Sequence, residues 1–399
     1  MATKPAPTST AAPGLRRVLT LWDLILYGVI VIQPTAPMGV FGVLSDRGHG
    51  HVVTTILIAL LAMLLTAISY GRMARAYPSA GSAFTYVGQE LNPALGYVTG
   101  WSMAMDYMLN PIICIIWCSK AAMNFAPHVP YAVWAIFFFV LFTGLNLLGV
   151  RTSARVNTGL AIGMGVVIAI FFVTAASYIF GHPHNEAGFF TRPFYDPQLF
   201  NVRAVLGGTS IAVLTYIGFD GISTLSEEVE NPRRNILLAT VLTCLVIGIL
   251  SAFEVYAAQL LWPASQPFPD TDTAFVHVAG RAAGPWFFLV MNLTLLVANF
   301  GSGMGAQLGA ARLLYGMGRS NALPKSFFGA VDPKRRIPRN NVIFVGLVGL
   351  GGAFLLSYAL GAEMLNFGAL IAFMGVNLSA IVHYYIRGRE KKMTDLLPP

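Results

Sequence analysis

The residues best suited to bind a charged solute are the few acidic and amide side chains inside long apolar runs. Asp220 is one of them, and Gly218 and Gly221 beside it permit a helix to unwind there. A carboxylate at that depth costs about 2.5–3.5 kcal/mol on insertion scales unless it serves a partner. We therefore expect Asp220 to hold an ammonium group or a proton, or else to cap the half-helix that follows. Tyr216, Gly218 and Phe219 are expected to shape the pocket, where an aromatic face suits an ammonium.

A second acidic residue lies in the apolar run at 96–124. Asp106 and Asn110 are four residues apart, so on a helix they share one face near the middle of the run. Asp106 is suited to hold the second amine of a diamine; the alternative is a carboxyl that bonds a neighbouring helix. Both residues are candidates for substrate binding.

A further set of polar residues is placed to couple an ion or to form a gate, and it comprises Glu227, Glu228, Glu254, Asn299 and Ser302. The pair at 227–228 lies near a predicted cytosolic loop, where pairing with the arginines at 233–234 would lock an inner gate. Glu254 would relay protons or face a watery vestibule. Asn299 and Ser302, three residues apart, would coordinate an ion or only join helices.

The elements that position these residues must be membrane helices. Hydrophobic residues make up 56% of the 399 residues and charged residues 11%, with a mean hydropathy of +0.66, which is more apolar side chain than a soluble globule buries. Apolar runs of about 20 residues recur, and each is long enough to cross a hydrocarbon layer of about 30 Å. We predict an all-α protein with about ten transmembrane helices, at 21–44, 52–70, 96–124, 129–148, 156–180, 204–226, 236–261, 285–314, 341–360 and 364–386.

The basic residues predict the orientation of these helices. Twenty of the 25 lysines and arginines fall in loops on the side of the N-terminus and four on the other side, with Lys120 at the end of a span. Because cytoplasmic loops are enriched in Lys and Arg, both termini are expected in the cytosol of a multi-pass plasma (inner) membrane protein. The predicted organisation is a flexible tail at 1–20, a transmembrane core at 21–386 and a cytosolic segment at 387–399. The scattered charge of +8 suits inner-leaflet lipid and not nucleic acid.

Two of the predicted spans are interrupted. The first contains Gln33, Pro34, Thr35, Ala36 and Pro37 near its middle, and proline both removes a backbone donor and blocks the preceding helical turn. The sixth contains the glycines beside Asp220. Breaks in spans 1 and 6 occupy matched positions of two five-helix halves, which is typical of inverted-repeat transporters. The alternative is that each helix is only kinked.

Three segments carry a family resemblance: TYIGFDGISTLSEEVENPRRNI at 215–236, the P-x-A-G-S-A-x-x-Y core within 68–101, and ARLLYGMGRSNALPKSFFGAVDPKRRIPRNNV at 311–342. They resemble the amino acid, polyamine and organocation permease superfamily, and are most similar to its putrescine-importer-like branch. The resemblance implies a LeuT-like fold of five plus five helices, with the substrate between broken helices 1 and 6. It also implies import driven by an ion gradient, with H⁺ as the expected ion and Na⁺ left open.

The chain departs from that family pattern in two places. Most amino acid permeases have a glycine-rich segment in span 1 whose N–H groups hold the substrate carboxylate, whereas this chain has the segment 33–37 with two prolines. Prolines cannot donate N–H bonds, which favours substrates without an α-carboxylate. The family also usually has two further helices, and this chain is predicted to end after ten.

These observations predict a secondary permease that imports a putrescine-like amine by proton symport with alternating access. The first alternative is an amino acid permease or exchanger, and a channel or transporter-like receptor is the alternative from another class. An enzyme is not expected, because the chain has no H-E-x-x-H, G-x-S-x-G or Walker motif. No cofactor or metal site is expected either, since Cys114 and Cys118 lie far from any cluster of histidines or carboxylates. The sequence leaves the oligomeric state open.

Overall fold

The computed structural model describes residues 19–387 except 78–81, 149–153, 184–187, 227–228, 264, 320, 322, 333–334 and 336, and side chains at 154–157 and 224 are also outside the description. In chain order its helices are α1 (Leu21–Ile32), α2 (Ala36–Arg47), α3 (Val52–Ala76), α4 (Ser82–Glu90), α5 (Pro93–Phe125), α6 (Tyr131–Leu148), α7 (Ala154–Gly181), α8 (Val202–Ala212), the 3₁₀ turns η1 (Val213–Tyr216) and η2 (Phe219–Leu225), α9 (Pro232–Leu261), α10 (Ala274–Ala283), α11 (Pro285–Arg319), α12 (Lys325–Phe328), α13 (Arg339–Leu355), α14 (Tyr358–Ile381) and the π-helix η3 (Val382–Arg387). The predicted terminal segments 1–20 and 387–399 lie almost wholly outside the described residues.

The helices confirm an all-α membrane protein. Among the described residues, eight helical segments are long and apolar enough to cross a membrane, and the bent pair of α1 and α2 adds a ninth. The shorter apolar helix α13 occupies the place of the remaining predicted span. The count of ten and the five-plus-five repeat stay predictions.

One boundary between predicted spans is wrong. The sequence places a span at 341–360, but α13 already ends at Leu355 and α14 begins at Tyr358. Ser357 caps α14, because its hydroxyl accepts a hydrogen bond from the backbone N–H of Leu360 at 3.2 Å. A continuous apolar run hides this boundary, since the cap is a single small residue.

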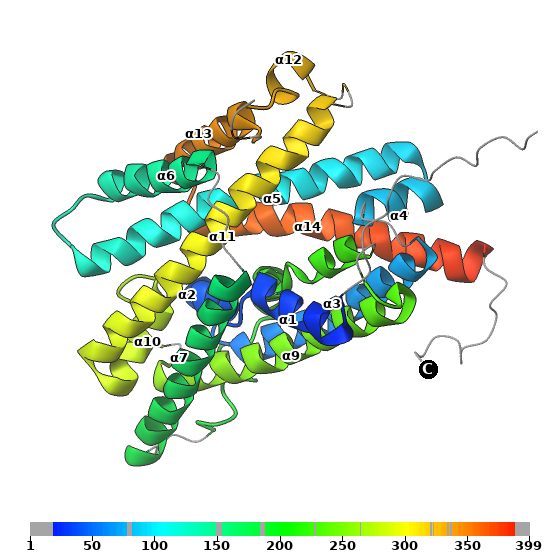
Figure 1. Cartoon of the computed structure of the whole chain (residues 1–399). Helices are drawn as coiled ribbons and strands as arrows, with labels where there is room; N and C mark the ends of the chain where they lie inside the picture. Colours follow the sequence, from blue (N-terminus) through cyan, green and yellow to red (C-terminus); the bar gives the residue numbers. More distant parts are fainter. Residues whose placement is uncertain are drawn as a thin grey trace, which may run out of the picture.

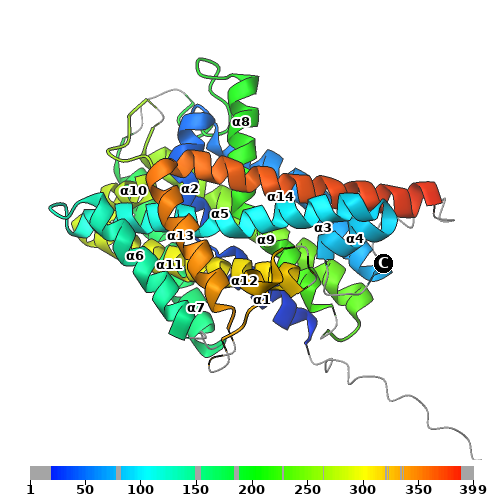
Figure 2. The same cartoon turned by 90° about the horizontal axis from the view of Figure 1, so that it is seen from above.

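The long helices pack in extended pairs. Both views show α5 beside α14 (Figures 1 and 2), and α3 packs along most of α9. Two glycines permit the close approach of α3 and α9. A Cβ on Gly71 would lie 2.6 Å from the Cα of Leu237, and one on Gly248 would lie 2.3 Å from Leu60 Cδ1. Small residues at such contacts let helix backbones approach closely in lipid.

Candidate functional site

The first break lies between α1 and α2, which meet at an angle of 46°. Helix α1 ends at Ile32, and Gln33 has a φ of +69°, outside the right-handed helical region. The Gln33 side chain donates from Nε2 to the carbonyl of Ala298 on α11 at 3.0 Å. The predicted interruption of span 1 is therefore confirmed, and α11 holds it in place.

The backbone of this break offers few donors to an anion. At the start of α2, the N–H of Ala36 bonds the carbonyl of Gln33 at 3.0 Å, and that of Met38 bonds the carbonyl of Thr35 at 3.1 Å. Between them, Pro37 has no N–H. Helix N-termini bind anions through free N–H groups, and the first three positions of α2 present none.

The second break follows α8. After the 3₁₀ turn η1, Ile217 is extended and Gly218 has a φ of +123° before η2 begins at Phe219. The N–H of Gly218 donates to Asp220 Oδ1 at 3.3 Å, so the carboxylate stabilises the break from inside. The predicted break beside Asp220 is confirmed at Gly218, whereas residues 219–221 are not unwound but belong to the 3₁₀ helix η2.

Replacing Gly218 with alanine is expected to destabilise the protein by about 2 kcal/mol, because residues with side chains rarely adopt its φ. The new Cβ would also lie 3.1 Å from Val31 Cγ1 on α1. Thermal unfolding of the purified protein measures the change. Gly144 is the matched control, since a Cβ there would meet nothing within 4 Å. A G218A protein as stable as G144A would show that the break tolerates a side chain.

Asp220 lies among aromatic hydroxyls and a second carboxyl. Asp220 lies within electrostatic range of Asp106 and Tyr107 of α5, of Tyr27 of α1 and of Tyr70 of α3. The hydroxyl of Tyr27 is 3.7 Å from where a Cβ on the adjacent glycine at 221 would lie. Within the part of the chain that the structure describes, no basic side chain pairs with either carboxyl. Asp106 and Asp220 thus offer two acidic groups with no basic partner among the described residues.

Tyr216 and Phe219 take packing positions beside this site. The Tyr216 hydroxyl donates to the carbonyl of Ile56 at 2.9 Å. The Phe219 ring is wholly buried and packs against Tyr70 and Phe373, with ring centroids 5.5 and 5.4 Å away. Both residues hold the second break against α3 and α14 rather than offering an open aromatic face.

The other predicted residues are dispersed. Asn110 accepts from Ser302 at 3.4 Å, so this pair joins α5 to α11, while Asn299 donates to the carbonyl of Leu295 in its own helix at 2.9 Å. Thr35 is 2% exposed within the first break. Glu254 lies on α9, buried and apart from the pair of carboxyls. The predicted gate at 227–228 lies outside the described residues.

Sequence reasoning missed the tyrosines of the site. Tyr27 and Tyr70 were not predicted, although each lies in an apolar run where a hydroxyl is unusual. Tyrosine hydroxyls inside such runs were the available signal. Tyr27, Tyr70 and Tyr107 belong to three different helices, and no spacing in the sequence encodes that they lie within electrostatic range of one aspartate.

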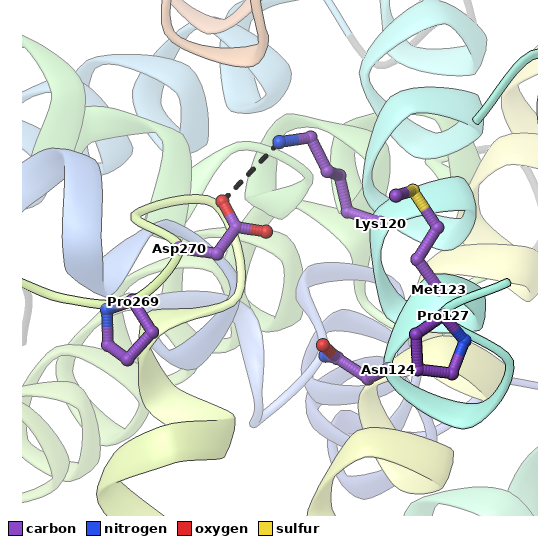
Figure 3. Close-up of a pocket in the computed structure, with 6 residues that line it drawn as sticks. All are labelled: Lys120, Met123, Asn124, Pro127, Pro269 and Asp270. Carbon is purple, nitrogen blue, oxygen red and sulfur yellow. Dashed lines mark hydrogen bonds and ion pairs between the residues drawn. The ribbon is translucent and has the colours of Figure 1, made fainter. Parts of the chain in front are cut away.

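A cavity of about 370 Å³ lies at the predicted outer end of α5. Figure 3 shows Lys120 pointing across it to Asp270, and the Nζ–Oδ1 distance is 3.4 Å. Lys120 also lies 3.7 Å from Asp272. Burial raises the pKa of Asp272 and the neighbouring Asp270 raises it further, while Lys120 opposes both. This cavity thus holds the two acidic groups of Asp270 and Asp272, and Lys120 supplies one positive charge beside them.

Comparison with known proteins places these features in context. The model of the amino acid permease family matches residues 31–397. The low-affinity putrescine importer PlaP of Escherichia coli is 36% identical over 388 residues, which cover 96% of this chain and 84% of that protein. The branched-chain amino acid permease BcaP of Bacillus subtilis is 25% identical over 403 residues, covering 96% and 83%. The mitochondrial cationic amino acid transporter 3 of Arabidopsis thaliana is 27% identical over 395 residues, covering 93% and 63%.

Proposed function

The chain belongs to the amino acid permease family, a family of transporters and not of enzymes, and from that premise we propose that it imports a putrescine-like organic amine. Import is by symport with protons, through alternating access of the site between the two broken helices. The protein acts in the plasma membrane with both termini in the cytosol, as the distribution of basic residues predicts.

The observation that carries this proposal is the presence of two acidic groups without a basic partner. Asp106 and Asp220 lie within electrostatic range of each other, and neither pairs with a basic group among the described residues. Putrescine carries two ammonium groups at neutral pH and no carboxylate. Two carboxyls can balance its two charges, and the tyrosine hydroxyls can accept hydrogen bonds from its ammonium protons.

An amino acid is the second candidate substrate, and two of the relatives named above transport amino acids. An α-carboxylate needs donors, and the start of α2 provides none because its amides are bonded or replaced by proline. A substrate carboxylate would also lie near two acidic side chains. Both features favour an amine.

Uptake into proteoliposomes tests the proposal. Purified protein is reconstituted and presented with labelled putrescine, arginine, lysine or leucine, under an acid-outside pH gradient or an inward sodium gradient. We expect putrescine to accumulate under the pH gradient, and protonophore to abolish accumulation. Accumulation of leucine without putrescine would overturn the substrate, and accumulation that requires sodium alone would overturn the coupling ion.

Replacing Asp106 with asparagine is expected to lower kcat/KM for putrescine about tenfold, which corresponds to about 1.4 kcal/mol. The reason is that the second ammonium of the diamine would lose its counter-charge. A monoamine such as butylamine has no second ammonium and should inhibit uptake more weakly than putrescine does. Its inhibition constant should differ by less than twofold between the Asp106→Asn protein and the wild type. Competition assays with both amines give the comparison. Equal losses for both would assign Asp106 to helix packing and not to the second amine.

A further inference from the structure

Glu254 is a buried acid with no hydrogen-bond partner among the described residues. It lies on α9 with none of its surface exposed, and neither carboxyl oxygen has a hydrogen-bond partner among the described residues. An ionised carboxylate in such a place would cost several kcal/mol. The described arrangement is therefore that of a neutral, protonated acid.

Within the described part of the chain, no charged group pairs with Glu254 to offset this burial. Helix α9 packs against α1, α2, α3, α7, α10, η1 and η2. Towards the outer end of α9, these elements carry Asp46, Arg47, His51, Tyr178, His277 and Arg281. Asp46 accepts from Thr271, Arg47 pairs with Glu363, His51 bonds the carbonyl of Gly48, and Arg281 bonds Tyr178. In the described chain, no hydrogen bond or ion pair joins any of these groups to Glu254.

Glu254 is one end of a row of hydroxyls on α9. Thr240, Thr243, Ser251 and Glu254 fall within an arc of about 80° on a helix that turns about 100° per residue. All four are wholly buried in the protein. The hydroxyls of Thr243 and Ser251 lack partners, as Glu254 does, in the part that the structure describes. Ser251 and Glu254 lie one turn apart, and Thr243 lies about 12 Å further along the helix, beyond the buried Ile247. Three unsatisfied polar groups on one buried face are unusual, because buried polar groups are generally hydrogen-bonded.

The row leads from the outer side to the second break. Glu254 is seven residues from the end of α9 at Leu261, a rise of about 10 Å. At the other end, Thr243 packs against α1 and η2. A Cβ on Gly28 would lie 2.9 Å from Thr243 Oγ1 and 2.6 Å from Ile222 Cδ1. Ile222 is two residues beyond Asp220, so the row ends beside the carboxyl site.

We infer that Glu254 is the residue that carries the coupled proton, an assignment that rests on the proposed proton-driven import. Its carboxylate takes a proton from the outer water when that side is open, and the neutral acid is buried in the described conformation. The proton leaves to water after the substrate is released inside, and the carboxylate is restored. Between Glu254 and the second break, the same face of α9 carries the unpaired hydroxyls of Ser251 and Thr243 on either side of the buried Ile247.

The test compares two transport modes in proteoliposomes. Putrescine accumulation under an acid-outside gradient needs the proton cycle, whereas exchange of labelled for unlabelled putrescine at equal pH does not. Glu254→Gln keeps the shape and cannot ionise, so accumulation should fall at least tenfold while exchange stays within twofold of wild type. Glu254→Asp should restore part of the accumulation. Glu363→Gln, which removes an exposed carboxylate, should leave both modes unchanged.

A Glu254→Gln protein that accumulates putrescine as the wild type does would overturn the inference. Wild-type protein that fails to accumulate putrescine under any pH gradient would instead overturn the proposed function. An infrared difference spectrum decides the state of Glu254 in either case. The carbonyl band of a protonated acid should be present at pH 7 and lost in Glu254→Gln, and its absence from the wild type would also overturn the inference.

Discussion

Replacing Asp220 with asparagine is expected to lower kcat/KM for putrescine about 100-fold, which is about 2.7 kcal/mol. Asp220 lies at the second break, its carboxyl group accepts from the N–H of Gly218, and it lies within electrostatic range of Asp106 and three tyrosines. The substitution removes the charge that would pair with an ammonium and keeps an oxygen that can accept the same backbone bond. Initial uptake rates across putrescine concentrations measure the effect.

Asparagine also separates the two roles expected of Asp220. Asn and Asp are nearly equal as helix caps, so a residue that only caps η2 would tolerate the change. Asp196→Asn is the control, since Asp196 lies in a loop on the predicted outer side, 4.0 Å from Arg192. Wild-type transport by a correctly folded Asp220→Asn protein would assign Asp220 to local structure alone.

Replacing Glu90 with glutamine is expected to destabilise the protein by about 2 kcal/mol. Only 4% of the Glu90 side chain is exposed. It accepts hydrogen bonds from Tyr77 and His383 and pairs with Arg387 at 3.3 Å. Breaking a buried ion pair costs about 3–5 kcal/mol, and the partial exposure of His383 and Arg387 lowers that figure. Thermal unfolding of wild type and variant gives the difference.

The cluster formed by Glu90, Tyr77, His383 and Arg387 predicts that the free energy of unfolding depends on pH. Burial opposes the charge of Glu90, but the hydrogen bonds from Tyr77 and His383 and the charge of Arg387 outweigh it and hold the pKa of Glu90 below its usual range. A carboxyl whose pKa is lower in the folded state stabilises fully above its unfolded pKa, about 4.3. This stabilisation is lost as the pH falls through the folded pKa.

At alkaline pH the tyrosine of the cluster titrates. Burial and the hydrogen bond to Glu90 raise the pKa of Tyr77 to about 12. Its stabilisation is complete below the unfolded pKa of about 10 and is lost as the pH rises through 12. The free energy of unfolding of the Glu90→Gln protein should therefore depend less on pH than that of the wild type, both in the acidic range where Glu90 titrates and in the alkaline range where Tyr77 titrates.

The control is Glu363→Gln, which breaks an exposed ion pair with Arg47 and should lower the free energy of unfolding by less than about 1 kcal/mol. Equal losses in the two variants would show that the Glu90 cluster stabilises no more than a surface pair.

The sequence by itself determined the membrane fold and the positions of both helix breaks. Those features are local: an apolar run of a given length forms a spanning helix, proline at 34 and 37 removes backbone donors, and Gly218 adopts a conformation that other residues avoid. The cost of a buried charge likewise identified Asp106, Asp220 and Glu254 as unusual before any contact was known.

Only the tertiary structure decided what surrounds those acids. Tyr27 and Tyr70 lie far from Asp220 in the chain, but their helices α1 and α3 pack against the second break. Packing also left Glu254 without a hydrogen-bond partner in the described part of the chain, and it brought His383 to Glu90, about 290 residues apart in sequence. Contacts of this kind depend on which helix faces meet and on the angles at which the helices cross. The faces and the angles follow from packing over the whole bundle, so no short segment of the sequence determines them.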